Sequence, residues 1–101
     1  PVIFSHSNAR ALSPTPRNVP DEVLARLPRN GGVVMVSSIS LFAVQGDEHA
    51  RWQAAFEQET GVKLGDAGYD AALARYTAVH PEPRATIADV ADHVEHVRDV
   101  V

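Results

Sequence analysis

The sequence contains no cysteine among its 101 residues. Disulfide bonds and metal sites built on thiolate ligands are therefore excluded. Because disulfides are rare in reducing compartments, and none can form here, we expect a cytoplasmic protein. The chain also has no run of about 18 consecutive apolar residues and no signal-peptide pattern, so we expect no membrane segment in it.

Basic residues are few as well. Nine Lys and Arg are outnumbered by 13 Asp and Glu, which gives a formal net charge of −4, and the basic residues do not cluster. Such a surface does not attract a phosphate backbone, so no nucleic-acid partner is expected. The sequence also lacks a glycine-rich phosphate loop and a Gly-x-Ser-x-Gly motif, and it predicts neither of the sites built on them.

The first part of the sequence has a strand–helix–strand pattern. Residues 2–4 and 33–36 are continuous apolar runs, which predict two strands buried on both faces. Between them, Pro20-Asp21-Glu22 favours a helix start, and we expect that helix to run to about Leu27. Pro28 and the glycines after it are expected to stop it. The connection is long enough for a parallel crossover.

Helical patterns fill most of the remaining chain and predict helices over residues 47–60, 69–79 and 86–101. Asp47 is a candidate N-cap for the first of these helices, and Gly61 is its expected stop. The last helix opens with a sequence that resembles a capping box, Thr86-Ile87-Ala88-Asp89. Its expected apolar face consists of residues at helical spacing: Ile87, Val90, Val94, Val97 and Val101.

His6 is the strongest candidate for chemistry on position alone. It follows the first predicted strand, at the end where (β/α)8 barrels carry their catalytic groups. A neutral imidazole is also a frequent metal ligand. A hydrogen-bonded structural histidine would fit the same position, and the pattern alone leaves both interpretations open.

The other histidines give weaker signals. His93 and His96 are neighbours on one face of the last predicted helix, but charged residues flank them and no third ligand lies nearby in the sequence. We therefore expect them to face solvent or to pack between helices. His49 and His80 stand alone, and both are expected at the surface.

Two arginines follow His6 in the predicted loop of residues 8–19, on the same rim. Arg10 or Arg17 would be able to clamp a carboxylate through two parallel hydrogen bonds. The alternative is an arginine that is exposed to solvent or paired locally.

Four segments together carry a family resemblance: PVIFSHSNARAL, RNVPDEVL, GGVVMV and ADVADHVEHVRDVV. In this order and spacing they resemble the membrane (renal-type) dipeptidase family, peptidase family M19. The resemblance covers nearly the whole chain and is strongest over residues 1–36 and 86–101. Residues 43–85 look like a longer helical insertion of bacterial members, so we expect a bacterial protein.

The resemblance implies an α/β fold, in which residues 1–101 form a fragment of a (β/α)8 TIM barrel with about two β-α units. It also implies a metal-dependent hydrolase that cleaves dipeptides with two zinc ions in the complete enzyme. His6 matches a zinc ligand of the family, and Arg17, rather than Arg10, matches the arginine that binds the substrate carboxylate. No catalytic acid or base is expected among these residues. The expected partners are a dipeptide substrate and the remainder of the barrel, and a homodimer stays an open alternative.

Two other interpretations stay open. The chain would also fit a non-catalytic remnant or packing module of a barrel, inactive by itself. Another metal-dependent amidohydrolase on the same barrel is the third interpretation, and it would lack the carboxylate-binding context of Arg17.

Overall fold

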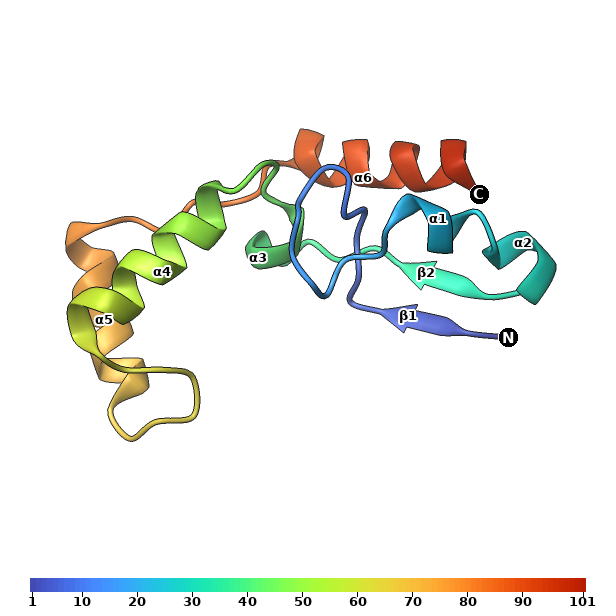
Figure 1. Cartoon of the computed structure of the whole chain (residues 1–101). Helices are drawn as coiled ribbons and strands as arrows, with labels where there is room; N and C mark the ends of the chain where they lie inside the picture. The colour runs from blue at the N-terminus through green and yellow to red at the C-terminus, as the bar shows by residue number, and fades with distance from the viewer.

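The computed structural model describes all 101 residues and divides them into two bodies (Figure 1). One body holds the strands and four of the helices, and the other is a hairpin of two longer helices at the opposite end of a molecule of 46 × 26 × 17 Å. No helix combines the length and the apolar character needed to span a membrane. In chain order the elements are β1 (Ile3–Ser5), α1 (Asp21–Leu24), α2 (Leu27–Asn30), β2 (Val33–Met35), α3 (Ser40–Ala43), α4 (Glu48–Thr60), α5 (Tyr69–Val79) and α6 (Ile87–Val100).

The two strands pair in parallel, as the sequence predicts. Their register places Phe4 opposite Val34. These two side chains pack against a buried cluster formed by the helical crossover, and α6 covers the same cluster through Val97 and Val100. The cluster itself consists of Val19, Leu24 and Leu27. Apolar burial on this side of the strands therefore joins the crossover to the last helix.

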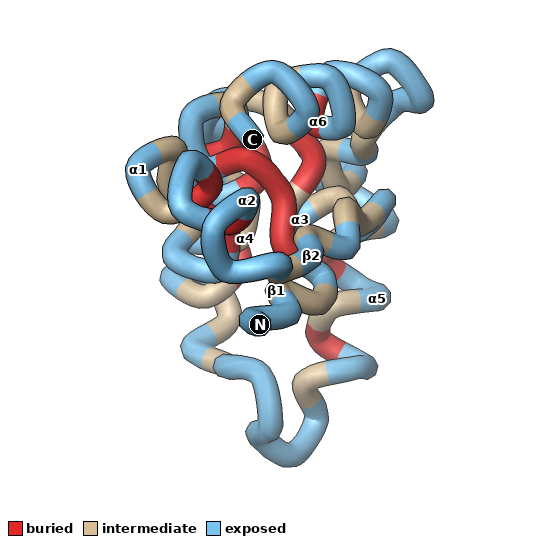
Figure 2. Tube along the Cα trace, turned by 90° about the vertical axis from the view of Figure 1, so that its right-hand side faces the viewer, coloured by how far each residue is buried: buried red, intermediate tan, exposed pale blue.

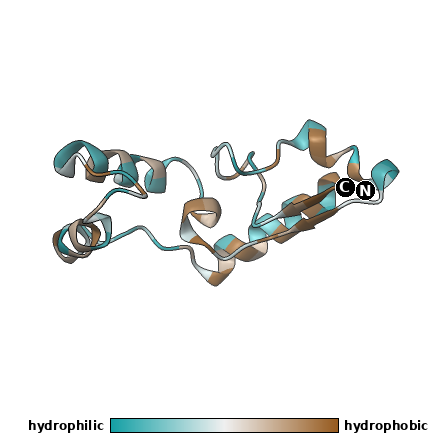
Figure 3. Ribbon diagram, turned by 90° about the horizontal axis from the view of Figure 1, so that it is seen from below, coloured by the Kyte–Doolittle hydropathy of each residue, from teal (hydrophilic) through white to brown (hydrophobic).

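The other side of the strand pair is exposed, so the expectation of burial on both faces is wrong for this chain. Ile3, Val33 and Met35 keep 51–68% of their surface in solvent. Figure 3 shows that both strands are hydrophobic along their length. A continuous apolar run predicts that two faces are covered. Here the crossover helices and α6 cover one of them, and no segment of the chain covers the second.

The predicted helix after Pro20 is divided into α1 and α2. Pro28 lies in the first turn of α2 rather than ending a helix, because proline has no N–H to contribute and the first turn requires none. Gly31 ends α2 with a φ of +71°. A side chain on Gly32 would meet the Val2 carbonyl oxygen at 2.5 Å, so this position requires glycine where the crossover returns to the sheet.

The α4–α5 hairpin confirms the two predicted helices and has its own core. Phe56 of α4 and Tyr76 of α5 are buried, with ring centroids 5.3 Å apart and an edge-to-face angle of 63°. Asp47 does not cap α4, and pairs instead with the Arg51 side chain at 3.2 Å. Most other residues of the hairpin are exposed or half-buried (Figure 2). That residues 43–85 are an insertion stays a prediction.

Helix α6 has the predicted capping box but not the predicted buried face. The Thr86 hydroxyl accepts from the Asp89 N–H at 3.1 Å, and the Asp89 carboxylate accepts from the Thr86 N–H at 2.8 Å. Ile87, however, is 91% exposed, and Val94 is about half exposed. The most buried residue of the helix is His93. Helix α6 therefore turns a different face toward the interior than its apolar spacing predicts, because His93 lies at the centre of the buried face.

The exposed strand face leads to a prediction about the 101-residue chain by itself. We expect it to self-associate with increasing concentration, because a short two-stranded sheet with exposed apolar residues is a template for intermolecular pairing. The double variant Ile3→Thr/Val33→Thr should associate less. Leu64→Thr is the matched control, since Leu64 is 82% exposed but lies in the loop between α4 and α5. Sedimentation velocity distinguishes these results, and a wild-type chain that stays monomeric with a sharp thermal transition would contradict the prediction.

Candidate functional site

The carboxyl end of β1 carries the predicted metal ligand. His6 directly follows the strand and is exposed, and it is the one non-glycine residue with a positive φ, at +51°. That conformation costs about 1–3 kcal/mol for a residue with a Cβ, so surrounding contacts must hold it. They come from Ser7, whose N–H bonds to the Met35 carbonyl at 3.3 Å and whose hydroxyl bonds to the Ser5 carbonyl at 3.1 Å. The turn leaves the His6 ring outside while the next residue enters the core.

The His6 ring has one nitrogen engaged and one free. Its Nδ1 lies 3.3 Å from the Ser5 hydroxyl, and the ring makes no other hydrogen bond in the chain. Metal-binding histidines commonly use one nitrogen for such an oxygen and the other for the metal. The ring also borders a hollow of about 260 Å³ with Met35 and Ser37. Its surroundings therefore fit a ligand that binds a metal through Nε2.

The rest of a metal site is absent from these 101 residues. No group of three histidine, aspartate or glutamate side chains lies close enough together to hold a metal ion. A structural or catalytic zinc site needs three or four protein ligands. The chain by itself therefore fits one ligand of a zinc site and not a complete one.

Arg17 lies beside His6, as the sequence predicts. Its guanidinium is exposed, donates to the Ser5 carbonyl at 3.4 Å and borders a hollow of about 310 Å³. His6 and Arg17 thus contact the same residue, His6 through the Ser5 hydroxyl and Arg17 through the Ser5 carbonyl. The structure brings the two predicted site residues together at the end of β1.

Arg10 differs from Arg17 because its guanidinium is already in use. It donates to the Asn18 carbonyl at 2.9 Å and to the Pro16 carbonyl at 2.7 Å. This is the locally paired alternative of the sequence analysis. Of the two arginines, Arg17 therefore has the guanidinium that is more available to bind a carboxylate.

Two buried asparagines that the sequence analysis did not single out hold the segment between β1 and α1, residues 6–19, which we call the rim loop. Asn8 exchanges two hydrogen bonds with the Ser37 backbone, of 2.9 and 2.7 Å. The Asn18 amide accepts from the Asn8 N–H and donates to the Ser13 and Phe42 carbonyls, each at 2.9 Å. Nothing in the sequence distinguishes these asparagines from ordinary loop residues, because the partners that require them are remote.

His93 corrects the expectation of a solvated helix face. It is fully buried where α6 meets the rim loop and α3. Its Nδ1 accepts from the Ala9 N–H at 3.1 Å, and its Nε2 lies 3.0 Å from the Ala43 carbonyl and 3.2 Å from the Ser13 hydroxyl. The other part of the expectation, a helix-packing role, is confirmed.

Burial lowers the pKa of His93 below its ordinary value of 6.5. The Ala43 carbonyl and the carboxylates of Asp89 and Asp92 act in the opposite direction, but desolvation of the charged ring is the larger effect. The nearby His96 ring adds to the lowering. The folded protein therefore holds the His93 ring neutral.

The remaining histidines divide between core and surface. His49 is buried, with its Nε2 2.7 Å from the Glu82 carboxylate, so the surface prediction is wrong for it. His80 is half exposed and stacks on Tyr76, as expected of a surface residue. His96 packs α6 onto α1 through a 2.8 Å contact with Asp21.

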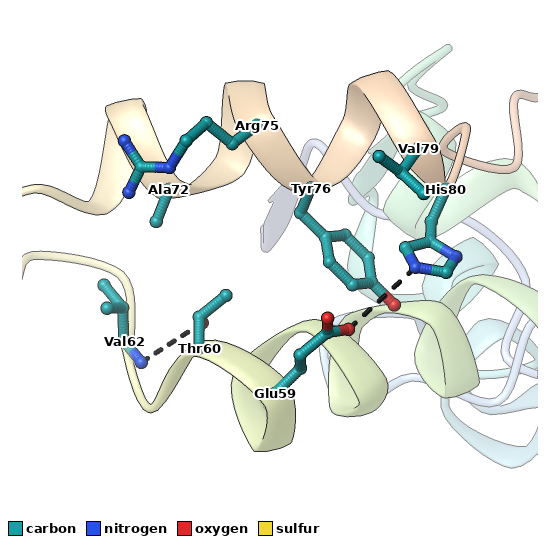
Figure 4. A pocket seen from close by; sticks show the side chains of 8 residues that line it. All are labelled: Glu59, Thr60, Val62, Ala72, Arg75, Tyr76, Val79 and His80. Carbon is teal, nitrogen blue, oxygen red and sulfur yellow. Dashed lines mark hydrogen bonds and ion pairs between the residues drawn. The ribbon is translucent and has the colours of Figure 1, made fainter.

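A larger hollow lies elsewhere, between α4 and α5 (Figure 4). It measures about 380 Å³ and is lined by Tyr76, His80 and Glu59 among other residues. Figure 4 shows that the side chains around it come from the two helices of the hairpin and from the residues just after each of them. Neither His6 nor Arg17 borders it. Its volume alone does not make it a reactive site, because it lacks the residues that meet at β1.

Comparisons with known proteins place the sequence in a family. Residues 1–101 match the family described as membrane dipeptidase (peptidase family M19). Dipeptidase aclJ of Aspergillus oryzae is 32% identical over 101 residues, which is 100% of this chain and 16% of the relative. The uncharacterized dipeptidase C965.12 of Schizosaccharomyces pombe is 37% identical over 97 residues, 96% of this chain and 15% of the relative.

A shorter stretch is more similar still. Dipeptidase ataJ of Aspergillus terreus is 64% identical over 36 residues, which is 36% of this chain and 9% of the relative. The chain spans less than a fifth of the length of these curated relatives. All three are fungal, so the expectation of a bacterial protein gains no support from them.

The lowered pKa of His93 predicts an acid-sensitive fold. Below pH 6.5 the unfolded chain protonates this ring while the folded protein does not, so the free energy of unfolding decreases as pH falls toward the folded-state pKa. Above pH 6.5 the contribution is fully present. The loss is at most about 1.4 kcal/mol per pH unit for one proton.

Urea denaturation of the protein that contains these residues measures this effect between pH 7.5 and 5. His93→Asn should flatten the pH dependence of the free energy of unfolding, whereas His80→Asn, at a half-exposed site, should not. Equal slopes for wild type and His93→Asn would show that His93 titrates alike in both states.

Proposed function

Because this chain belongs to the membrane dipeptidase family (peptidase family M19), we propose that it forms part of a zinc-dependent dipeptidase and supplies one zinc ligand and the arginine that binds the substrate carboxylate. The observation that carries the proposal is the shared contact of His6 and Arg17 with Ser5. A dipeptide is short, so its peptide carbonyl at the metal and its free carboxylate are close together. The zinc ligand and the arginine that binds the carboxylate must therefore also be close. Two groups on either side of one residue meet that requirement.

The fold proposed for the complete protein is a (β/α)8 barrel, of which these residues supply about two β-α units. The parallel pairing of β1 and β2 supports it, as does the helical cover on one face of the pair. In a barrel the exposed Ile3, Val33 and Met35 would meet side chains from the other strands. His6 would then lie at the carboxyl-terminal mouth, where barrel enzymes bind their substrates.

His6 would bind zinc through Nε2, with the Ser5 hydroxyl orienting the ring through Nδ1. Bound zinc lowers the pKa of a water ligand toward neutrality and polarises a peptide carbonyl. The positive φ of His6 sets the direction of its Cα–Cβ bond, and the contact with the Ser5 hydroxyl restrains the ring. This reduces the freedom that metal binding must remove.

Arg17 would orient the substrate by its free carboxylate. An exposed guanidinium with one long hydrogen bond can rotate into a bidentate pair with a carboxylate. The same contact explains a preference for dipeptides. A longer peptide carries an uncharged amide where the dipeptide carries its carboxylate, so the guanidinium loses its charged partner.

The second candidate function is a packing module of a barrel without catalysis of its own. The lack of three clustered metal-ligating groups favours it for the 101 residues in isolation. A packing module, however, gives no reason for the strained backbone of His6 or for the exposed guanidinium of Arg17. Metal and substrate measurements on the intact protein decide between the two functions.

The first test concerns zinc. In the intact protein, His6→Ala should reduce the bound zinc and nearly abolish dipeptide hydrolysis, because the remaining ligands of that ion leave it undercoordinated. His96→Ala is the control, since His96 contacts Asp21 between α6 and α1 and not at the end of β1. It should keep its zinc. Metal analysis by mass spectrometry is the measurement, and an unchanged zinc content in His6→Ala would remove His6 from the proposal.

The second test concerns the carboxylate. Wild type should prefer a dipeptide with a free carboxylate over the same dipeptide amidated, and Arg17→Ala should lose much of that preference. A charge-assisted bond of this kind is worth about 1.5–3 kcal/mol, or roughly ten- to a hundredfold in kcat/KM. Arg17→Lys keeps the charge but not the fork, and should remain impaired.

Arg29→Ala serves as the matched control, because Arg29 is an exposed arginine at the end of α2. Its kcat/KM ratio for the two substrates should equal that of wild type. If Arg17→Ala keeps the wild-type ratio as well, the carboxylate binds elsewhere, and Arg10 is the next residue to replace.

A further inference from the structure

We propose that His93 is a positioning residue of the enzyme, which holds the rim loop so that Arg17 meets the substrate carboxylate. The inference rests on the proposed function. His93 does not border the hollows beside His6 and Arg17, and it is fully buried. Its role would therefore be exerted through the loop and not by contact with substrate or metal.

The hydrogen bonds of His93 define a single protonation state. The Ala9 N–H can only donate, so Nδ1 must accept and carry no proton. The proton of the neutral ring is then on Nε2, which donates to the Ala43 carbonyl at 3.0 Å. One ring thus joins the rim loop to α3 from its position on α6.

The rim loop passes this restraint to Arg17 by two short routes. Ala9 lies opposite Val19 in an isolated parallel bridge, where the Arg10 N–H bonds to the Val19 carbonyl at 3.0 Å and the Val19 N–H to the Asn8 carbonyl at 2.8 Å. Fixing Ala9 therefore fixes the residues that follow Arg17.

The second route starts at the other side of the ring. Ser13 lies 3.2 Å from His93 Nε2 through its hydroxyl, and its carbonyl accepts from the Asn18 amide at 2.9 Å. Asn18 is the immediate neighbour of Arg17 in the chain. Both routes reach the backbone next to Arg17 from the same buried histidine.

An apolar residue at position 93 would leave the Ala9 N–H and one Ala43 acceptor site buried without this partner. Such a group costs the full desolvation of a polar atom. The two asparagines anchor the loop to itself and to the segment after β2, but they make no bond to α6. His93 is the residue through which α6 holds the loop by a hydrogen bond, across 84 positions of sequence.

The test compares two substitutions that each keep one half of the ring. His93→Asn retains an acceptor near Nδ1, so it can still receive the Ala9 N–H. His93→Gln retains a donor near Nε2, so it can still reach the Ala43 carbonyl but leaves Ala9 without an acceptor. Each variant loses one buried hydrogen bond, so their stabilities should be similar, while their effects on the rim loop should differ.

Steady-state kinetics of the intact enzyme give the first readout. His93→Gln should raise KM for the free dipeptide by about tenfold and weaken the preference over the amidated substrate. His93→Asn should stay near wild type in both, and neither variant should change the zinc content. Equal KM values for the two variants would overturn the positioning role.

Hydrogen–deuterium exchange gives a second readout that needs no activity. Exchange over residues 6–19 should be faster in His93→Gln than in His93→Asn, and the Ala9 amide of wild type should exchange as slowly as amides of the buried core. Fast exchange at Ala9 in wild type would overturn the inference even if neither variant folds. A wild type that hydrolyses no dipeptide would refute the proposed function instead, while the exchange data still decide whether His93 holds the loop.

Discussion

Two hydrogen bonds between the Asn8 side chain and the Ser37 backbone tie the chain after β1 to the chain after β2. The strands have three residues each and pair over that length alone. Their pairing would be marginal without further support. The asparagine extends the connection beyond the last paired residues, and it does so with both the donor and the acceptor of one amide. The geometry of the rim, and of the loop that returns to α1, depends on this contact.

The strain at His6 is a consequence of the same arrangement. Ser7, Asn8 and Ala9 are buried, so the chain must turn inward immediately after the strand. A residue with φ of +51° makes that turn and leaves its own side chain outside. A loop without buried anchors would relax into a more common conformation. The site residue is thus held in place by polar contacts in the interior and not by the strand alone.

Sequence reasoning was most successful where the signal is local. The helices α4, α5 and α6, the Gly61 stop and the Thr86–Asp89 capping box are each specified by neighbouring residues. The parallel strand pair follows from two apolar runs and a connection of sufficient length. The burial of His49 and the backbone partners of His93 could not be predicted, because Glu82 and the Ala9 amide lie 33 and 84 positions away from them. The proximity of His6 and Arg17 was predicted from their position on one rim, and the contact with Ser5 required the structure.

The most direct test of the account is a crystal structure of the intact protein loaded with zinc, measured at the zinc absorption edge with a dipeptide analogue bound. The account predicts an anomalous peak about 2.0–2.1 Å from His6 Nε2 and the Arg17 guanidinium paired with the carboxylate of the analogue. An anomalous peak with no density connecting it to His6, or a carboxylate bound away from Arg17, would contradict it.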